Sequence, residues 1–527
     1  MERTFDTLIV GAGSAGCVLA NRLSADPARR VLLLEAGGED RWLWFHIPVG
    51  YLFAMGNPRA DWCYQTTPQP GLNGRALPYP RGKVLGGSSA INGMIYMRGQ
   101  RQDYDGWGLP GWDWASVLPL FRKSEDYFGG ESEFHGVGGE LRVERQRLSW
   151  EVLERWREAC IQYGIPPRDD FNTGDNEGVG YFHVNQRRGL RLSAKRAFLD
   201  PVRSRPNLEV RTGVLVDRLI WRDGRVEGVE YLRQGRRERV AAGQVILAAG
   251  AVATPCILQR SGIGDEARLR AAGLPCRLHL PGVGAALQDH LQIRVQFRIE
   301  GAVTLNCLMK SLRGRAKMAL EYLLWRSGPL SMAPSQLGAF LRSAPEVERP
   351  DLEYHVQPMS AERLGRELHP FPGITASICN LRPTSRGRVD AVGPDPRDPP
   401  RIDPNYLATE EDRRLAVRAI EITREIARQP AVASLRPVEI KPGAACATPE
   451  ALVRAAGDIA TTIFHPTCTC RMGRDDDPEA VTGPDLRLRG FANLFVADAS
   501  VFPSIPSGNT HAPTVMVAEK LARDLSR

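Results

Sequence analysis

Residues 7–35 place a glycine-rich turn between two apolar segments, and this pattern limits the possible folds more than any other feature. Residues 7–10 have the apolar character of a buried strand. Glycines follow at GxGxxG spacing, and residues 17–23 continue with helical periodicity. A second apolar segment, residues 31–34, ends on Glu35. A strand, glycine turn, helix and strand ending on an acid is typical of a dinucleotide-binding βαβ unit. The chain is therefore predicted to contain a parallel sheet that binds the phosphates of a dinucleotide.

The glycines of this turn have separate physical roles. Gly11 permits the tight turn, Gly13 lets a pyrophosphate approach the backbone, and Gly16 lets the helix pack closely on the strand. Free N–H groups and the positive dipole at the start of the helix favour phosphate. Glu35 can accept hydrogen bonds from an adenosine ribose, and its charge disfavours a 2′-phosphate. An ordinary βα turn is the alternative interpretation, and the second strand and the acid count against it.

Composition narrows the class of protein. The 527 residues suggest two or three domains, and 43% hydrophobic with 25% charged residues is ordinary for a globular protein. The net charge of +8 suits an anionic cofactor or a weak attraction to acidic membranes, but the basic residues are scattered, which argues against nucleic acid. We expect no signal peptide, and no apolar stretch is long enough for a bilayer. Ten scattered cysteines indicate reduced thiols and a cytoplasmic location, with association with the inner face of the membrane as the alternative.

A second glycine-rich stretch covers residues 81–93. It is not a nucleotide P-loop, because Lys83 is followed by Val84 rather than Ser or Thr. So many small residues indicate that a large, flat group approaches the backbone, and Asn92 is the polar side chain best placed to meet it. A structural turn before residues 94–97 is the alternative.

The rest of the chain contains further predicted strands of the same sheet. Between them, residues of a different pattern predict a second sheet. Residues 208–220 and 226–231 alternate like antiparallel strands, residues 245–250 and 494–498 are apolar like buried strands, and a last helix is predicted over 514–525. From about residue 294 to 445, alternating segments and a helix at 412–428 indicate a sheet with helices on one side. Residues 310–326 are basic and apolar at helical spacing. Most helices of this kind pack on a domain, and contact with a membrane surface is the alternative.

Four stretches spread over nearly the whole chain together resemble the glucose–methanol–choline (GMC) oxidoreductases, which are flavoproteins that oxidise alcohols. They are the N-terminal glycine motif and residues 82–105, 250–264 and 465–513. The choline dehydrogenase and aliphatic alcohol dehydrogenase branch is the most similar. The resemblance implies bound FAD and a substrate domain that covers the flavin ring with a sheet and helices.

The predicted fold class is therefore α/β, with a Rossmann-like FAD-binding domain and an inserted α+β substrate-binding domain of sheet and helices. The predicted FAD-binding domain consists of residues 1–145, 191–293 and 456–527, of which the last part carries the catalytic histidines. The predicted substrate-binding domain consists of residues 146–190 and 294–455.

By the resemblance, FAD contacts can be carried over position by position. Val216 is expected at the adenine, Asn92 with its neighbours at the flavin ring, and Asp498 at the ribityl chain and pyrophosphate. Ile91 occupies the position where some relatives carry the histidine that attaches FAD, so non-covalent FAD is expected. The full set of predicted cofactor-binding residues is Gly11, Gly13, Ser14, Ala15, Gly16, Glu35, Ala36, Val84, Gly87, Asn92, Gly93, Met94, Val216, Asp498 and Ala499.

His465 and His511 are the predicted catalytic residues. Alcohol oxidation removes the hydroxyl proton while a hydride leaves the same carbon, and a neutral imidazole with a pKa of about 6.5 suits the first task. The resemblance implies that a primary alcohol becomes an aldehyde, with proton abstraction at His465 and hydride transfer to flavin N5. His511 is expected to stabilise the substrate oxygen. The choline-like branch usually has Asn at this position, whereas oxidases of aryl and sugar alcohols have His, which weakens a choline assignment.

Other readings stay open at this point. They are choline dehydrogenase, a flavin-dependent lyase or photodecarboxylase of the same fold, and a flavin-binding protein without catalysis. A zinc site at His465, Cys468 and Cys470 is disfavoured because Cys-x-Cys is tighter than the usual spacing, and no metal is expected. The expected partners are a small-molecule alcohol and an electron acceptor, which is oxygen, a quinone or a protein carrier. Nucleic acid is not expected, and peripheral membrane contact is the open alternative.

Overall fold

The N-terminal strand–helix–strand unit forms as the glycine pattern predicts. In the computed structural model, which describes residues 5–362 and 367–526, β1 (Phe5–Val10) pairs in parallel with β2 (Val31–Leu34), and α1 (Ser14–Leu23) connects them. Gly11 has φ +98°, and a Cβ added to Gly16 would lie 1.8 Å from the Gly11 carbonyl oxygen. The two glycines therefore permit the sharp turn and the close approach of α1 to the strand.

The first sheet has the strand order β10-β2-β1-β13-β12-β11, and β24 pairs with β13. Its core pairings, β10–β2, β2–β1, β1–β13 and β13–β24, are parallel, whereas β11, β12 and β13 form an antiparallel meander. These strands are β10 (Leu208–Arg211), β11 (Val214–Arg222), β12 (Arg225–Arg233), β13 (Arg236–Leu247) and β24 (Leu494–Val496).

Two sequence-based expectations about these elements are wrong. Residues 208–220 are not one antiparallel run, because Gly213 adopts φ +69° and separates β10, which is parallel to β2, from β11. The last helix, α13 (His511–Asp524), begins before residue 514, because Pro513 lies in its first turn, where the missing N–H has no intrahelical partner to lose. His511 is consequently the first residue of a helix rather than part of a loop.

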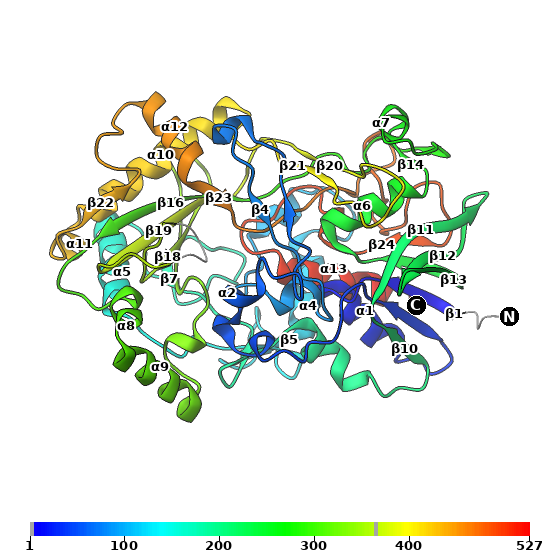
Figure 1. Cartoon of the computed structure of the whole chain (residues 1–527), viewed down its shortest axis with the longest axis horizontal. Coiled ribbons are helices and arrows are strands. Elements are labelled where there is room, and N and C mark those ends of the chain that lie inside the picture. The colour runs from blue at the N-terminus through cyan, green and yellow to red at the C-terminus, as the bar shows by residue number, and fades with distance from the viewer. Residues whose placement is uncertain (1–4, 363–366, 527) are drawn as a thin grey trace.

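The second sheet has the order β22-β16-β19-β18-β17-β7, and β23 pairs with β16. Figure 1 shows the two sheets at opposite ends of the long axis, with α1 and α13 packed together between them. The strands are β7 (Gly178–Tyr181), β16 (Leu291–Arg298), β17 (Leu337–Leu341), β18 (Leu352–Gln357), β19 (Gly373–Asn380), β22 (Val438–Lys441) and β23 (Ala460–Thr462).

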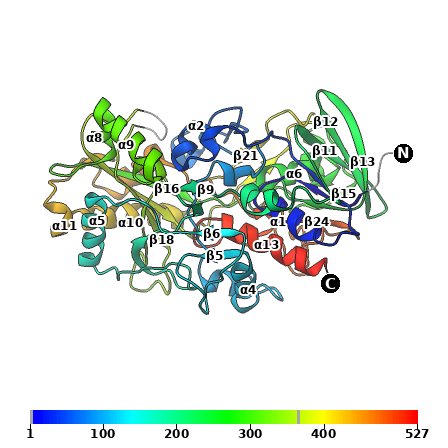
Figure 2. The same ribbon diagram turned by 90° about the horizontal axis from the view of Figure 1, so that it is seen from below.

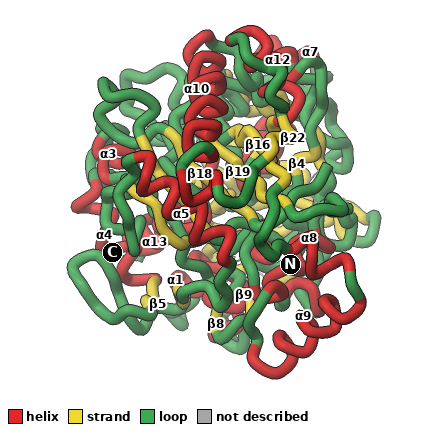
Figure 3. The backbone as a smooth tube through the Cα atoms, turned by 90° about the vertical axis from the view of Figure 1, so that its left-hand side faces the viewer, coloured by secondary structure: helices red, strands yellow, loops and turns green. Residues whose placement is uncertain are grey.

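One face of this sheet is covered by α5 (Glu151–Tyr163) and α10 (Glu410–Ala427), as Figure 3 shows. Ile293, Val295 and Phe297 of β16 lie in the apolar core beneath these helices. Gln292, Arg294 and Gln296 alternate with them and so point to the opposite face, yet they are buried as well. The sheet therefore has an apolar face and a buried polar face.

The remaining helices and paired strands are shorter or peripheral. They are α2 (Tyr51–Ala54), α3 (Arg101–Asp105), α4 (Trp114–Ser124), α6 (Gly250–Arg260), α7 (Glu266–Ala271), α8 (Leu305–Lys310), α9 (Leu312–Trp325), α11 (Pro430–Ala433), α12 (Pro449–Ile459), and the pairs β3 (Tyr64–Gln65) with β4 (Pro78–Tyr79), β5 (Glu125–Tyr127) with β6 (Leu141–Val143), β8 (Gln186–Arg187) with β9 (Leu190–Arg191), β14 (Ile263–Gly264) with β15 (Leu278–His279), and β20 (Arg388–Asp390) with β21 (Arg401–Asp403).

The ends of strands β16 and β23 suggest domain boundaries that differ from the predicted ones. β16 begins at Leu291, before the expected boundary at 294, and β23 comes from the segment 456–527 that is expected in the FAD-binding domain. We propose boundaries at 291 and 462 for this part of the substrate-binding domain, and residues 1–4 of the expected first domain lie outside the described residues. Within residues 5–362 and 367–526, no helix combines the length and apolar character needed to cross a bilayer.

Candidate active site

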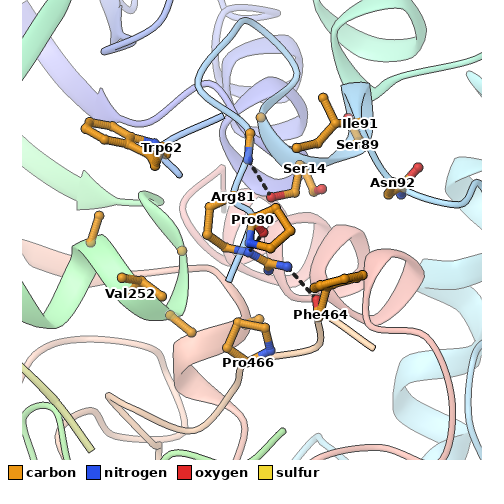
Figure 4. Close-up of a pocket in the computed structure, with 18 of the residues that line it drawn as sticks. Ser14, Trp62, Pro80, Arg81, Ser89, Ile91, Asn92, Val252, Phe464 and Pro466 are labelled. Carbon is orange, nitrogen blue, oxygen red and sulfur yellow. Dashed lines mark hydrogen bonds between the residues drawn. The ribbon is translucent and has the colours of Figure 1, made fainter. Parts of the chain in front are cut away.

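A cavity between the two sheets brings together most of the predicted site residues. Gly16 and Val84 do not line it, because Gly16 holds α1 against β1 and Val84 is buried beside Phe45 and Ile91. Figure 4 shows part of the lining, including Ser14 of α1 and Asn92 of the second glycine-rich stretch. The predicted residues that line the cavity are Gly11, Gly13, Ser14, Ala15, Glu35, Ala36, Gly87, Asn92, Gly93, Met94, Val216, His465, Asp498, Ala499 and His511.

The end of the cavity at α1 fits the pyrophosphate of FAD. A Cβ added to Gly13 would meet no protein atom within 4 Å, whereas a Cβ on Gly87 would lie 2.7 Å from the Gly13 Cα. The two glycine-rich stretches thus face one another, and the N-terminus of α1 opens beside them. Unpaired N–H groups at a helix N-terminus attract phosphate, so these residues can hold the diphosphate of the cofactor.

Two buried carboxylates brace this end of the cavity. The Glu35 side chain accepts hydrogen bonds from the N–H groups of Ala12 and Gly37, each at 2.8 Å, and burial raises its pKa to about 7. Asp498 accepts from the N–H of Gly250 at 2.8 Å and from the Thr254 hydroxyl at 2.6 Å, which ties the end of β24 to the start of α6. Burial also raises the pKa of Asp498.

The loop that carries His465 is held by a buried carboxylate, Asp289. The His465 N–H donates to Asp289 Oδ1 at 2.7 Å, and the Tyr79, Tyr406 and Thr462 hydroxyls donate to Asp289 Oδ2. On the other side of the loop, Arg81 Nη2 donates to the Phe464 carbonyl at 2.6 Å (Figure 4). The position of the His465 backbone is therefore fixed from two directions.

Hydrogen bonds determine which nitrogen of His465 carries its hydrogen. His290 Nε2 lies 3.1 Å from the Leu381 carbonyl, which can only accept, so this nitrogen is the donor. Neutral His290 then has a lone pair on Nδ1, and the 3.1 Å contact between the two Nδ1 atoms requires His465 Nδ1 to donate. The lone pair of His465 is therefore on Nε2, which accepts from Asn509 Nδ2 at 3.1 Å.

Burial keeps both imidazoles neutral. It lowers the pKa of His290 and lowers the pKa of His465 well below its ordinary range, and the neighbouring basic groups His290, His355 and Arg81 add to the effect on His465. A neutral imidazole with its lone pair on Nε2 beside a cavity can accept a proton from a bound molecule that takes the place of the Asn509 amide. This arrangement fits a general base.

His511 presents a second nitrogen to the same cavity. Its Nδ1 lies 2.8 Å from the Ser14 hydroxyl, and within the described residues its buried Nε2 has no hydrogen-bond partner, nor has Asn509 Oδ1. Burial, with a smaller contribution from Arg191, lowers the pKa of His511 to about 4. The orphaned polar atoms of His511 and Asn509 are suited to a ligand that brings its own hydrogen-bonding groups.

The buried polar face of the second sheet forms another wall of the cavity. Gln292 and Arg294 come from β16, and His355 and Gln357 come from β18. Ser335 lies just before the start of β17. Two-residue alternation along residues 292–297 is the sequence signal that could have identified this wall. Sequence reasoning also misses His290, because 175 positions separate it from His465 and no spacing rule relates them.

A zinc site beside His465, which the cysteine spacing disfavours, would use Cys468 and Cys470. Cys468 and Cys470 are buried, and burial raises the pKa of both thiols. Among the residues that the structure describes, no three His, Cys, Asp or Glu side chains are grouped as metal ligands.

Comparison with known proteins identifies relatives that span nearly the whole chain. A family model described as GMC oxidoreductase matches residues 5–292, and a second with the same description matches residues 383–518. Mitochondrial choline dehydrogenase of Homo sapiens is 42% identical over 535 residues, covering 98% of this chain and 89% of that protein. Alcohol dehydrogenase [acceptor] of Pseudomonas putida is 40% identical over 530 residues, covering 99% and 96%. The crystal structure of pyridoxine 4-oxidase from Mesorbium loti has a TM-score of 0.89 and 33% identity, covering 99% of each chain.

Proposed function

Because the chain belongs to the GMC oxidoreductase family, it is an FAD-dependent oxidoreductase that acts on CH–OH donors, and we propose that His465 is its general base. The reaction is the oxidation of a primary alcohol to an aldehyde. The observation that carries the assignment of His465 is the hydrogen-bond chain from the Leu381 carbonyl through His290, which leaves the Nε2 lone pair of His465 at the cavity.

Each group in the site has a distinct task in this proposal. Bound FAD supplies the acceptor for the hydride that leaves the alcohol carbon. His465 Nε2 takes the hydroxyl proton, and His290 Nδ1 then accepts a charge-assisted hydrogen bond from the imidazolium. His511 Nε2 donates to the substrate oxygen, for which Ser14 must donate its hydroxyl hydrogen to His511 Nδ1. The alcohol thus loses one proton and one hydride and becomes the aldehyde.

The test of this assignment is anaerobic flavin reduction in a stopped-flow instrument. We expect His465→Ala to lower the rate about 10²–10⁴-fold while FAD stays bound, as general-base removal does elsewhere. His279→Ala is the matched control, because His279 is exposed outside the cavity. A His465→Ala variant that reduces its flavin near the wild-type rate would remove His465 from this role.

The substrate is a small-molecule alcohol, and the electron acceptor is oxygen, a quinone or a protein carrier. We further propose that the protein contacts an anionic membrane through α9. This helix stands out from the substrate-domain end (Figures 1 and 2), and Leu312, Leu323 and Trp325 are 80%, 77% and 63% exposed. The exposed basic residues on α9, which are Arg313, Arg315 and Lys317, complement anionic headgroups.

Vesicle co-sedimentation tests the contact. The protein should bind vesicles that contain anionic phosphatidylglycerol more strongly than vesicles of phosphatidylcholine alone, and the double variant Leu323→Glu, Trp325→Glu should lose that binding. Val438→Glu, at an apolar residue that is also exposed but lies on β22, should keep it. Equal binding by all variants would contradict the proposal.

A further inference from the structure

A buried cation without a carboxylate partner lines the cavity. Arg294 is 6% exposed and lines the same cavity as His465 and His511. Its Nη2 donates to Gln357 Oε1 at 3.1 Å and its Nη1 to Ser377 Oγ at 3.4 Å, and both acceptors are neutral. Among residues 5–362 and 367–526, Arg294 forms no ion pair with a carboxylate. An unpaired charge is costly to bury, so a guanidinium kept in this place indicates an anionic ligand.

The strand register shows how Arg294 is presented. Arg294 of β16 lies opposite Ser377 of β19, which lies opposite His355 of β18, so the three side chains form one row on the polar face of the sheet. Tyr51 of α2 lines the same cavity; burial raises the pKa of its phenol, and the positive charges of Arg191 and, to a smaller extent, Arg294 act in the opposite direction. A guanidinium and a phenolic hydroxyl thus line one cavity, and both can donate to a carboxylate.

Glu353, a buried acid on the same sheet, forms no ion pair with Arg294. Glu353 lies in the next row of the sheet, opposite Cys379, which is itself opposite Gln292. Its Oε1 is 3.0 Å from Nε2 of His355, and Glu353 does not line the cavity. Burial lowers the pKa of Arg294 to about 10, which leaves it cationic at neutral pH.

We propose that the alcohol substrate carries a carboxylate, which Arg294 binds together with the Tyr51 hydroxyl while the CH–OH group meets His465. This inference rests on the proposed alcohol oxidation and specifies its substrate class as hydroxy acids. Guanidinium forms charge-assisted, often bidentate hydrogen bonds with carboxylate. A quaternary ammonium alcohol such as choline, in contrast, brings a second positive charge toward Arg294.

The experiment compares three alcohols that share one benzyl alcohol frame. They carry a carboxylate, its methyl ester or a trimethylammonium group at the para position, and anaerobic flavin reduction gives the second-order rate constant for each. We expect the wild-type protein to prefer the carboxylate over the ester about 10- to 150-fold, which corresponds to one charge-assisted hydrogen bond. Arg294→Met should remove this preference, and Arg294→Gln serves if Arg294→Met loses FAD.

Arg298→Met is the matched control, because Arg298 lies on the same strand and the same face but is exposed and outside the cavity. It should keep the wild-type preference. Preference for the ester or the ammonium alcohol, or a carboxylate preference that survives both Arg294 variants, would overturn the proposal and leave alcohol oxidation intact.

If none of the three alcohols reduces the flavin, the proposed function fails. The binding of an unreactive carboxylate then tests the anion site at Arg294 separately. The unreactive 4-methylbenzoate should then perturb the flavin absorption of the wild-type protein and of Arg298→Met, but not that of Arg294→Met. Absence of binding to the wild-type protein would overturn the anion site as well.

Discussion

Replacing His290 by phenylalanine should slow flavin reduction although His290 does not line the cavity. The ring of His290 is fully buried and accepts a hydrogen bond from His465 at 3.1 Å. That bond is worth about 1 kcal/mol while His465 is neutral and about 1.5–3 kcal/mol once His465 becomes an imidazolium. Only the difference, about 0.5–2 kcal/mol, acts on the barrier, so the rate should fall about 2- to 30-fold.

Anaerobic stopped-flow reduction by a primary alcohol measures this effect, and the flavin absorption of each variant confirms that FAD is bound. Phenylalanine also leaves the Leu381 carbonyl without its donor, so a loss of stability of about 1–3 kcal/mol should accompany the kinetic effect. His290→Asn separates the two effects, because its side-chain oxygen can accept from His465 Nδ1. If Asn and Phe slow the reaction equally, or if Phe leaves it within a factor of two of wild type, the proposed orientation of His465 is wrong.

Three further predictions concern the cofactor and His511. Because Ile91 stands where some relatives attach the flavin, acid precipitation should release intact FAD, and flavin that remains on the polypeptide would contradict this. His511→Asn should keep much of the rate of flavin reduction, because an amide also donates, whereas His511→Ala should lose roughly 2.7–4 kcal/mol of transition-state stabilisation; equal impairment would exclude hydrogen-bond donation. The pKa of His511 falls to about 4 on folding, so between pH 6.5 and 4 the unfolded chain binds a proton that the folded protein does not. In denaturant titrations the wild-type protein should therefore lose up to about 3 kcal/mol relative to His511→Asn as pH falls through this window.

The N-terminal unit can be predicted from the sequence because the interactions that determine it join residues close together in the chain. Gly11, Gly16 and Glu35 lie within one strand–helix–strand unit, where turn geometry and helix packing depend on near neighbours in the chain. The start of α13 at His511 lies before the predicted start at residue 514, because Pro513 is tolerated in the first turn of a helix.

The site needed long-range information that no periodicity contains. The link between His290 and His465 depends on how β16 and the His465 loop meet, and Asn509 reaches His465 from the loop before α13. Arg294 is a different case. Its alternation with Ile293 and Val295 is visible in the sequence, but a polar residue in an alternating strand ordinarily faces water, and only the tertiary structure shows that this one faces a cavity.

The separation of the sheet's strands along the chain has a consequence for biosynthesis. β13 pairs with β1 on one side and with β24 on the other, so the last parallel strand joins a sheet whose first strand is made far earlier. Pairings between such distant segments carry a large loop-closure cost and form late in folding. On the ribosome, the apolar edge of β13 must remain unpaired until residues 494–496 emerge, and Asp498 and His511 emerge later still. A nascent chain therefore cannot complete its flavin site during most of its synthesis, and aggregation at that edge competes with folding until the end.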